Sequence, residues 1–94
     1  MTQIFKYPIE VTDVQRVELP VSAKILTVQF QHDKLCLWAR VECGDTTKET
    51  RTIEVFGTGH TMLDTSGPRL IERNYIGTVQ QHGGILVWHV FERV

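Results

Sequence analysis

The sequence predicts an all-β fold, a small antiparallel sandwich or partly open barrel of about seven strands. The first observation is composition: 11 Val, 7 Ile and 11 Thr stand among 94 residues, whereas Ala occurs only twice. β-branched side chains fit a pleated sheet and lose rotamer freedom in a helix, for which Ala is the best residue. The second is that apolar and polar residues alternate over most of the chain, which is typical of half-buried strands.

Hydrophobic patterning places the individual strands. In the first, Phe5, Tyr7 and Ile9 share one face, and Pro8 indicates a sheet edge because it has no N–H to donate. Clean alternation on both sides of residues 32–34 predicts a hairpin. The last segment is apolar on both faces, which is expected at the centre of a sheet or at a subunit interface. The predicted strands span residues 4–11, 14–19, 23–31, 35–42, 50–56, 75–81 and 85–94.

Glycine-containing turns separate the later strands. Residues 57–60 end the fifth strand, and residues 82–84 join the last two, since glycine supplies the positive φ that tight hairpin loops need. Between these turns the alternation stops, and residues 68–74 have room for at most one short helical turn. We expect residues 1–94 to form a single domain.

Charge and hydropathy exclude several classes of function. Ten Lys and Arg against 11 Asp and Glu give a formal charge of −1, so bulk attraction to nucleic acid is not expected. No apolar run approaches the roughly 20 residues of a membrane-spanning helix, and residues 1–6 lack the layout of a signal peptide. We therefore expect a cytoplasmic protein with no membrane partner. The small core and the open sheet edges favour a homo-oligomer.

The sequence shows no recognisable catalytic or metal-binding set. Cys36 and Cys43 are expected to be free thiols, although their pairing stays open. No His or Cys pairs stand at zinc-ligand spacing, so neither a metal nor another cofactor is expected. The serines lie outside any nucleophile motif, and the aspartates lie in turns, where Asp commonly bonds the backbone. An enzyme is therefore the alternative rather than the main hypothesis.

Two groups of residues are candidate ligand contacts. The glycines of the turn at residues 57–60 let backbone amides approach an anion, as in phosphate-binding nests. Trp38 and Arg40 share one strand face, where an indole can stack on a base and a guanidinium can hold a phosphate. Each group also has a structural interpretation. The glycine turn can simply end a strand, and Trp38 can pack against a second sheet or a subunit while Arg40 extends its charged end to solvent. The predicted ligand-binding residues are Trp38, Arg40, Arg51, Gly57, Thr58, Gly59 and His60.

The last strand supplies the candidate interface residues Trp88, His89 and Phe91. Large aromatic side chains are frequent anchors of protein interfaces. His89 shares a face with Val87 and Phe91. It is either a core histidine whose two nitrogens are both hydrogen-bonded, or part of a pocket with Tyr75 or an arginine.

Seven short blocks, in order along nearly the whole chain, resemble a family of small bacteriophage proteins that carry a domain of unknown function. The resemblance implies a phage-encoded accessory protein that acts in the host bacterial cytoplasm. It brings no known catalytic or binding residues. The blocks are KYPI (6–9), ELP (18–20), AKIL (23–26), LCLWA (35–39), GTGH (57–60), YIGT (75–78) and GGILVWHVF (83–91).

Three functional hypotheses follow. In the first, the protein binds and sequesters a small anionic ligand, such as a host nucleotide immune signal, in pockets at subunit interfaces. In the second, it is a protein–protein inhibitor of a host defence or host-takeover target, or a virion or assembly component, with Trp38, Trp88 and Phe91 as anchors. In the third, it is a small hydrolase. We place sequestration first because the chain combines phosphate-compatible turns with no catalytic set.

Overall fold

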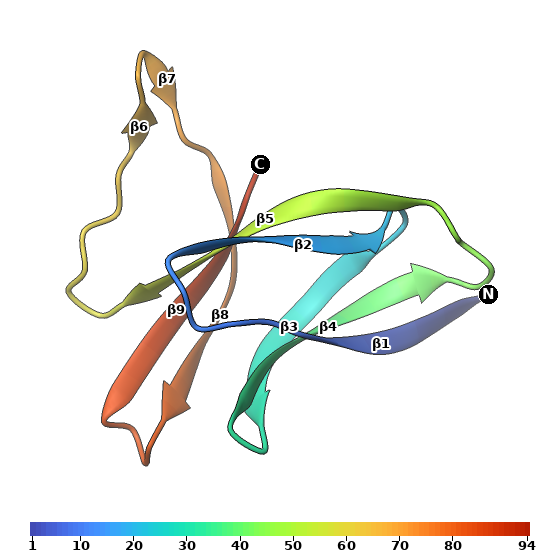
Figure 1. The fold of residues 1–94 in the computed structure, drawn as a ribbon, viewed down its shortest axis with the longest axis horizontal. Helices are drawn as coiled ribbons and strands as arrows, with labels where there is room; N and C mark the ends of the chain where they lie inside the picture. The colour runs from blue at the N-terminus through green and yellow to red at the C-terminus, as the bar shows by residue number, and fades with distance from the viewer.

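The computed structural model describes residues 1–94 as strands and turns, with no helix (Figure 1). The all-β prediction is therefore confirmed, and each predicted strand is present with ends that differ by at most three residues. No helix that could span a membrane is present. The strands are β1 (Thr2–Pro8), β2 (Val14–Pro20), β3 (Lys24–Gln31), β4 (Lys34–Glu42), β5 (Lys48–Gly57), β6 (Thr65–Ser66), β7 (Arg69–Leu70), β8 (Arg73–Gln81) and β9 (Leu86–Arg93).

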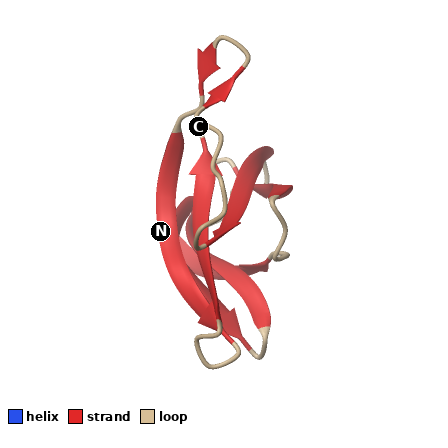
Figure 2. Ribbon diagram, turned by 90° about the vertical axis from the view of Figure 1, so that its left-hand side faces the viewer, coloured by secondary structure: helices blue, strands red, loops and turns tan.

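The long strands form two sheets that pack face to face in an open sandwich. One sheet has the order β1-β4-β3 and the other β2-β5-β9-β8, and all neighbouring strands are antiparallel. The molecule is flat, with extents of 41 × 40 × 15 Å, as the rotated view in Figure 2 shows. β9 lies between β5 and β8, which confirms the central position predicted from its two apolar faces. β1 lies at an edge, as Pro8 indicates.

The core lies between the inner faces of the two sheets. Alternate residues of each strand point inward, so Leu37 of β4, Ile53 of β5 and Val90 of β9 are fully buried. The other residues point outward, which leaves each sheet with a solvent-facing outer surface. The buried apolar residues form two clusters, one of Ile9, Val28, Leu35, Leu37, Ile53, Val55, Val79 and Val90, the other of Leu19, Ala23, Ala39 and Val41.

One side of the sandwich is closed where β3 lies beside β8 without a hydrogen-bonded ladder. Each strand carries a β-bulge there, at Leu26 in β3 and at Ile76 in β8. A Cβ atom on Gly77 would lie 3.0 Å from Cγ1 of Val28. Gly77 therefore lets β8 approach β3 closely enough to cover this side of the core.

The tight turns follow the predicted hairpins. His32 and Asp33 join β3 to β4 with φ angles of 50° and 61°, and Gly83 and Gly84 help to join β8 to β9 with positive φ. The short helical turn that the sequence allowed at residues 68–74 is absent. Thr65 pairs with Leu70 instead, around a tip formed by Gly67 and Pro68. This small β6-β7 hairpin projects away from the sandwich (Figure 1).

Candidate functional site

The outer surface of strands β5, β9 and β8 carries three layers of chemically distinct side chains, and we call it the β5-β9-β8 face. The strand register places all of these side chains on one side of the sheet and pairs those of β8 and β9 directly, whereas on β5 Glu54 lies opposite Phe91 and Phe56 opposite His89, so that each layer reaches β5 diagonally. Arg73 lies opposite Arg93, Tyr75 opposite Phe91, and Thr78 opposite His89. The layers are charged (Glu54, Arg73, Arg93), aromatic (Phe56, Tyr75, Phe91) and polar (Thr58, Thr78, His89).

The charged layer holds two arginines around one carboxylate. Arg73 Nε donates to Glu54 Oε1 over 2.6 Å, and the two side chains are only 9% and 6% exposed. Arg93 Nη2 lies 3.5 Å from Glu54 Oε2, and its side chain is 39% exposed. Like charges opposite each other destabilise a sheet, and one carboxylate balances only one guanidinium. Arg93, with one long contact, keeps N–H donors for another anion.

The aromatic layer runs across all three strands. The ring centroids of Phe56 and Phe91 are 6.0 Å apart in an edge-to-face arrangement, and those of Tyr75 and Phe91 are 5.3 Å apart. The guanidinium of Arg73 lies 5.3 Å from the centre of the Phe56 ring, a cation–π contact that joins this layer to the charged one. Tyr75 is 60% exposed, so one end of the row is open to solvent beside Arg93.

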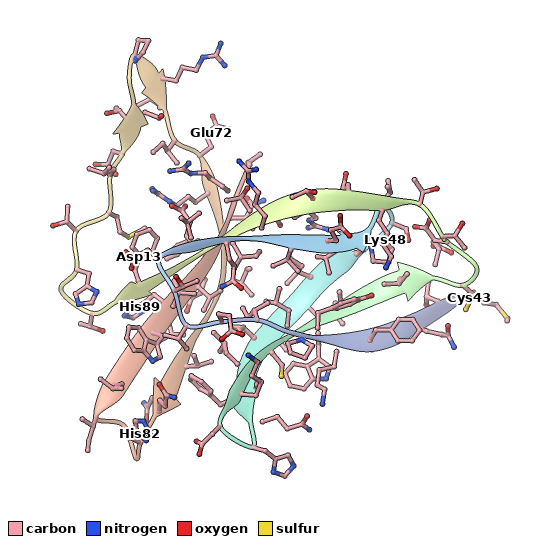
Figure 3. All side chains as sticks on the ribbon, viewed as in Figure 1. Asp13, Cys43, Lys48, Glu72, His82 and His89 are labelled. Carbon is pink, nitrogen blue, oxygen red and sulfur yellow. The ribbon has the colours of Figure 1, made fainter.

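The polar layer is a continuous chain of hydrogen bonds centred on His89, which Figure 3 labels on β9. His89 Nε2 lies 2.7 Å from Thr58 Oγ1, and Nδ1 lies 2.9 Å from Thr78 Oγ1. Thr78 Oγ1 also bonds the hydroxyl of Tyr75. Both ring nitrogens therefore have partners, but the ring lies on an outer face rather than in the core. Thr78 also connects the His89 ring to Tyr75, which the sequence analysis names as a pocket partner of His89.

A cleft of about 490 Å³ opens beside the charged layer. Phe56, Arg73 and Arg93 line its sheet side, and His60 and Leu63 line the side formed by the loop after β5. Arg73 Nη2 donates to the carbonyl oxygen of Leu63 over 2.8 Å and so holds this loop against the sheet. The exposed Asp13 lies at the rim and adds a second carboxylate to the lining.

The turn at residues 57–60 is closed on itself. His60 Nδ1 accepts the N–H of Gly57 at 3.3 Å, and the N–H of His60 donates to the Gly57 carbonyl at 3.0 Å. The N–H of Thr58 donates to the carbonyl of Val87. A Cβ atom on Gly57 would lie 2.7 Å from His60 Cε1, so the imidazole keeps this position only beside a glycine. In this conformation the turn presents the side chains of Thr58 and His60, rather than a nest of free amides.

The remaining predicted ligand-binding residues lie elsewhere. Trp38 and Arg40 share the outer face of the β1-β4-β3 sheet, on the other side of the sandwich. Arg51 forms a two-bond ion pair with Glu92 and donates to the carbonyl of Ala23. The hydrogen-bonded Glu92 carboxylate raises the pKa of Arg51, against the opposing effect of partial burial. Arg51 therefore ties β5 and β9 to the start of β3.

Among the predicted interface residues, His89 and Phe91 belong to the β5-β9-β8 face, together with the turn at residues 57–60. Trp88 points to the opposite side of β9, packs against the core and donates its Nε1–H to Gln81 Oε1 over 3.0 Å. The structure thus brings together Thr58, His60, His89 and Phe91, and it does not bring Trp38, Arg40 or Arg51 to them.

Sequence reasoning missed Glu54, Phe56, Arg73, Thr78 and Arg93 as site residues. The β8-β9 hairpin was predictable. Counting residues along β9 from its turn correctly identifies those on the outer face of the sheet. On β8 the bulge at Ile76 shifts the alternation, so that Thr78 and Tyr75 share a face although they are three residues apart. No sequence signal marks that bulge apart from the glycine at position 77.

Neither a disulfide nor a cluster of metal ligands is found. Cys36 is buried in β4, Cys43 is exposed in the turn after it, and both are free cysteines. No three His, Cys, Asp or Glu side chains lie close enough together to hold a metal ion.

A family model described as a domain of unknown function, DUF7352, matches residues 1–94. The chain belongs to the DUF7352 family. Comparisons with curated proteins and with solved structures gave no match. The predicted relation to proteins that carry a domain of unknown function is confirmed at this level, and the phage origin of this DUF7352 chain stays a prediction.

Proposed function

We propose that the protein binds a small planar anion, such as a nucleotide, on the β5-β9-β8 face and holds it without chemical change. The supporting observation is the pair of arginines that lie opposite each other with one buried carboxylate between them. A phosphate or carboxylate of the ligand would accept hydrogen bonds from Arg93 and balance the second positive charge. Glu54 keeps Arg73 in place for that arrangement.

The aromatic layer provides a stacking surface for the planar part of the ligand. Tyr75 and Phe91 lie directly opposite each other, next to Arg93 along the strands, so a ring stacked on Tyr75 would have its anionic group within reach of Arg93. Stacking on an aromatic side chain is worth about 1–3 kcal/mol per base. The hydroxyls of Thr58 and Thr78, held by His89, are positioned to bond polar groups on the same ligand.

The resemblance to phage accessory proteins gives this binding a biological role. A phage protein that holds a nucleotide signal of its bacterial host in the cytoplasm lowers the free concentration of that signal. The predicted homo-oligomer would multiply the number of binding faces. This role is supported by the resemblance and by the binding face. It requires that the bound ligand stay chemically unchanged.

Thermal unfolding in the presence of mononucleotides, cyclic dinucleotides and inorganic phosphate tests the proposal. A ligand at about ten times its Kd adds about 1.4 kcal/mol of stability, which is roughly 7 °C for a chain of this length. We expect such a shift for a nucleotide and a smaller one for phosphate, which has no ring. Arg93→Gln and Tyr75→Leu should reduce the nucleotide shift. Arg69→Gln is the matched control, because Arg69 is an exposed arginine on the projecting hairpin.

The ligand is then released by heat and analysed by mass spectrometry. Recovery of the unchanged nucleotide supports binding without turnover, whereas a hydrolysed product favours the small-hydrolase hypothesis. An absence of any nucleotide shift, or an equal loss of the shift in Arg69→Gln, would contradict the proposed binding face.

A second candidate function, inhibition of a partner protein, is supported by the β6-β7 hairpin. The hairpin projects from the sandwich and carries Leu70, which is 77% exposed, while Leu63 lies exposed in the strand-free segment before it. Exposed apolar side chains on a projecting element are typical of protein contacts. Recovery of a stoichiometric host protein that is lost in Leu70→Ser, together with no nucleotide shift, would favour this function over ligand binding.

A further inference from the structure

The outer surface of the β1-β4-β3 sheet brings three cations around one tryptophan, and we call it the β1-β4-β3 face. In the strand register, Trp38 lies between Lys6 of β1 and Thr27 of β3. Two residues further along β4, Arg40 lies between Ile4 and Lys24. Lys6, Lys24 and Arg40 therefore point to the same side of the sheet as the indole of Trp38.

None of these three cations has a carboxylate partner. Lys6 Nζ donates to Gln31 Oε1 over 2.7 Å, and Arg40 Nε donates to Thr2 Oγ1 over 3.3 Å. The ion pairs of the protein involve other cations. Glu42 is the carboxylate nearest along β4, two residues beyond Arg40, and it lies 4.0 Å from the Met1 amino group. The face is therefore locally cationic although the whole chain carries a charge of −1.

The surface also has room for a phosphate beside its cations. Lys24 and Arg40 line a hollow of about 160 Å³ with Thr2, Ser22 and Glu42, and no apolar side chain lines it. Trp38 is half-buried and lies beside Lys6 across the strand pair, so its ring has an outer side on the face. The rows of Trp38 and Arg40 are about 6.7 Å apart, as two residues of a strand require.

We propose that the β1-β4-β3 face binds single-stranded nucleic acid. Lys6, Lys24 and Arg40 would contact successive phosphates, and an unpaired base would stack on Trp38. Cationic surfaces that carry aromatic side chains bind single strands in this way because each base has a stacking face. A duplex fits less well, since its bases are already stacked and paired. The site lies on the opposite side of the sandwich from the β5-β9-β8 face, so it goes beyond the proposed ligand binding and is independent of it.

Fluorescence anisotropy with labelled 12-nucleotide oligo(dT) and oligo(rU) tests the proposal. Three phosphate contacts give a salt slope of about −2, so binding should weaken about 20-fold between 50 and 200 mM salt. The triple variant Lys6→Gln/Lys24→Gln/Arg40→Gln should lose most of the binding and most of this slope. Arg16→Gln/Lys48→Gln/Arg69→Gln removes the same charge from exposed positions off this face and should bind like the wild type. Figure 3 shows Lys48 in the right-hand half of the molecule, where β5 begins beside the end of β2.

Trp38 separates base stacking from simple charge attraction. Trp38→Leu should weaken binding roughly tenfold, whereas Trp38→Phe should keep most of it because phenylalanine also stacks. Circular dichroism melting of each variant verifies that it is folded at the assay temperature. Arg93→Gln should leave oligonucleotide affinity unchanged, which distinguishes failure here from failure of the proposed ligand binding.

Several results would overturn the inference. They are no binding at 50 mM salt, an equal loss of affinity in the two triple variants, or equal affinity for a duplex of the same length. Displacement of the oligonucleotide by an equal charge concentration of polyglutamate would also overturn it, because that result would indicate a site for acidic protein segments.

Discussion

Replacement of Glu54 by Gln should destabilise the protein strongly and at the same time strengthen anion binding. Glu54 and Arg73 are almost completely buried as a pair, and Arg93 lies 3.5 Å from the same carboxylate. Removal of one partner from a buried ion pair costs about 3–5 kcal/mol, because the other charge is left without compensation. The glutamine keeps one oxygen for Arg73, so we expect the lower end, about 3 kcal/mol. For 94 residues this lowers Tm by roughly 15 °C.

Urea denaturation measures the free energy of unfolding of Glu54→Gln with and without phosphate. Glu10→Gln is the matched control, because the Lys34–Glu10 pair has side chains that are 43% and 74% exposed and should contribute less than about 1 kcal/mol. The variant now has two uncompensated arginines, so phosphate should stabilise it more than it stabilises the wild type. A loss of less than 1 kcal/mol, or an equal effect of phosphate on both proteins, would refute the role given to this charged layer.

Two other substitutions test particular contacts. Gly57→Ala should cost about 1 kcal/mol, since its Cβ displaces the His60 ring and the Gly57 N–H loses its acceptor, and should cost much less when His60 is already Ala. Urea denaturation of this double-mutant cycle would contradict the contact if the two costs were additive. N–H and hydroxyl donors, chiefly those of Ser22, hold the pKa of Asp45 below its ordinary value, so this carboxylate stabilises the fold at neutral pH and stops doing so as pH falls through the lowered pKa. Asp45→Asn should therefore be less stable than the wild type at pH 7 and nearly equal to it at a pH of about 2, and an undiminished difference in acid would contradict this assignment.

Most of the fold could be predicted from the sequence because each strand has one inner and one outer face. Alternation places Leu37 and Ile53 inward and predicts the hairpin at His32 and Asp33, whose positive φ angles close it. The continuous apolar run of the last strand predicts a central position, and β9 occupies it. Strand order was beyond reach, because alternation does not say which edges meet. The bulges at Leu26 and Ile76, where β3 approaches β8, also leave no mark in the hydrophobic pattern.

The candidate site was predicted only in part. The turn at residues 57–60 and the strand that carries His89 and Phe91 do meet on one face. The glycines of that turn serve its own geometry, because His60 folds back over Gly57. Arg51 has a half-buried structural partner in Glu92, a pairing that only the antiparallel arrangement of β5 and β9 brings about. The cross-strand pair Arg73 and Arg93 depends on the β8-β9 register, which the bulge at Ile76 shifts by one residue.

Nuclear magnetic resonance gives the most direct test of ligand binding on the β5-β9-β8 face. Adenosine 5′-monophosphate is titrated into isotope-labelled protein while the backbone amides, the Arg93 Nε–H and the His89 ring are observed. The account predicts the largest shifts at Tyr75, His89, Phe91 and Arg93, with smaller shifts in the amides of β1 and β4, whose face meets only one base and one phosphate in a mononucleotide. An unperturbed spectrum at millimolar nucleotide, or shifts confined to the opposite sheet, would contradict it.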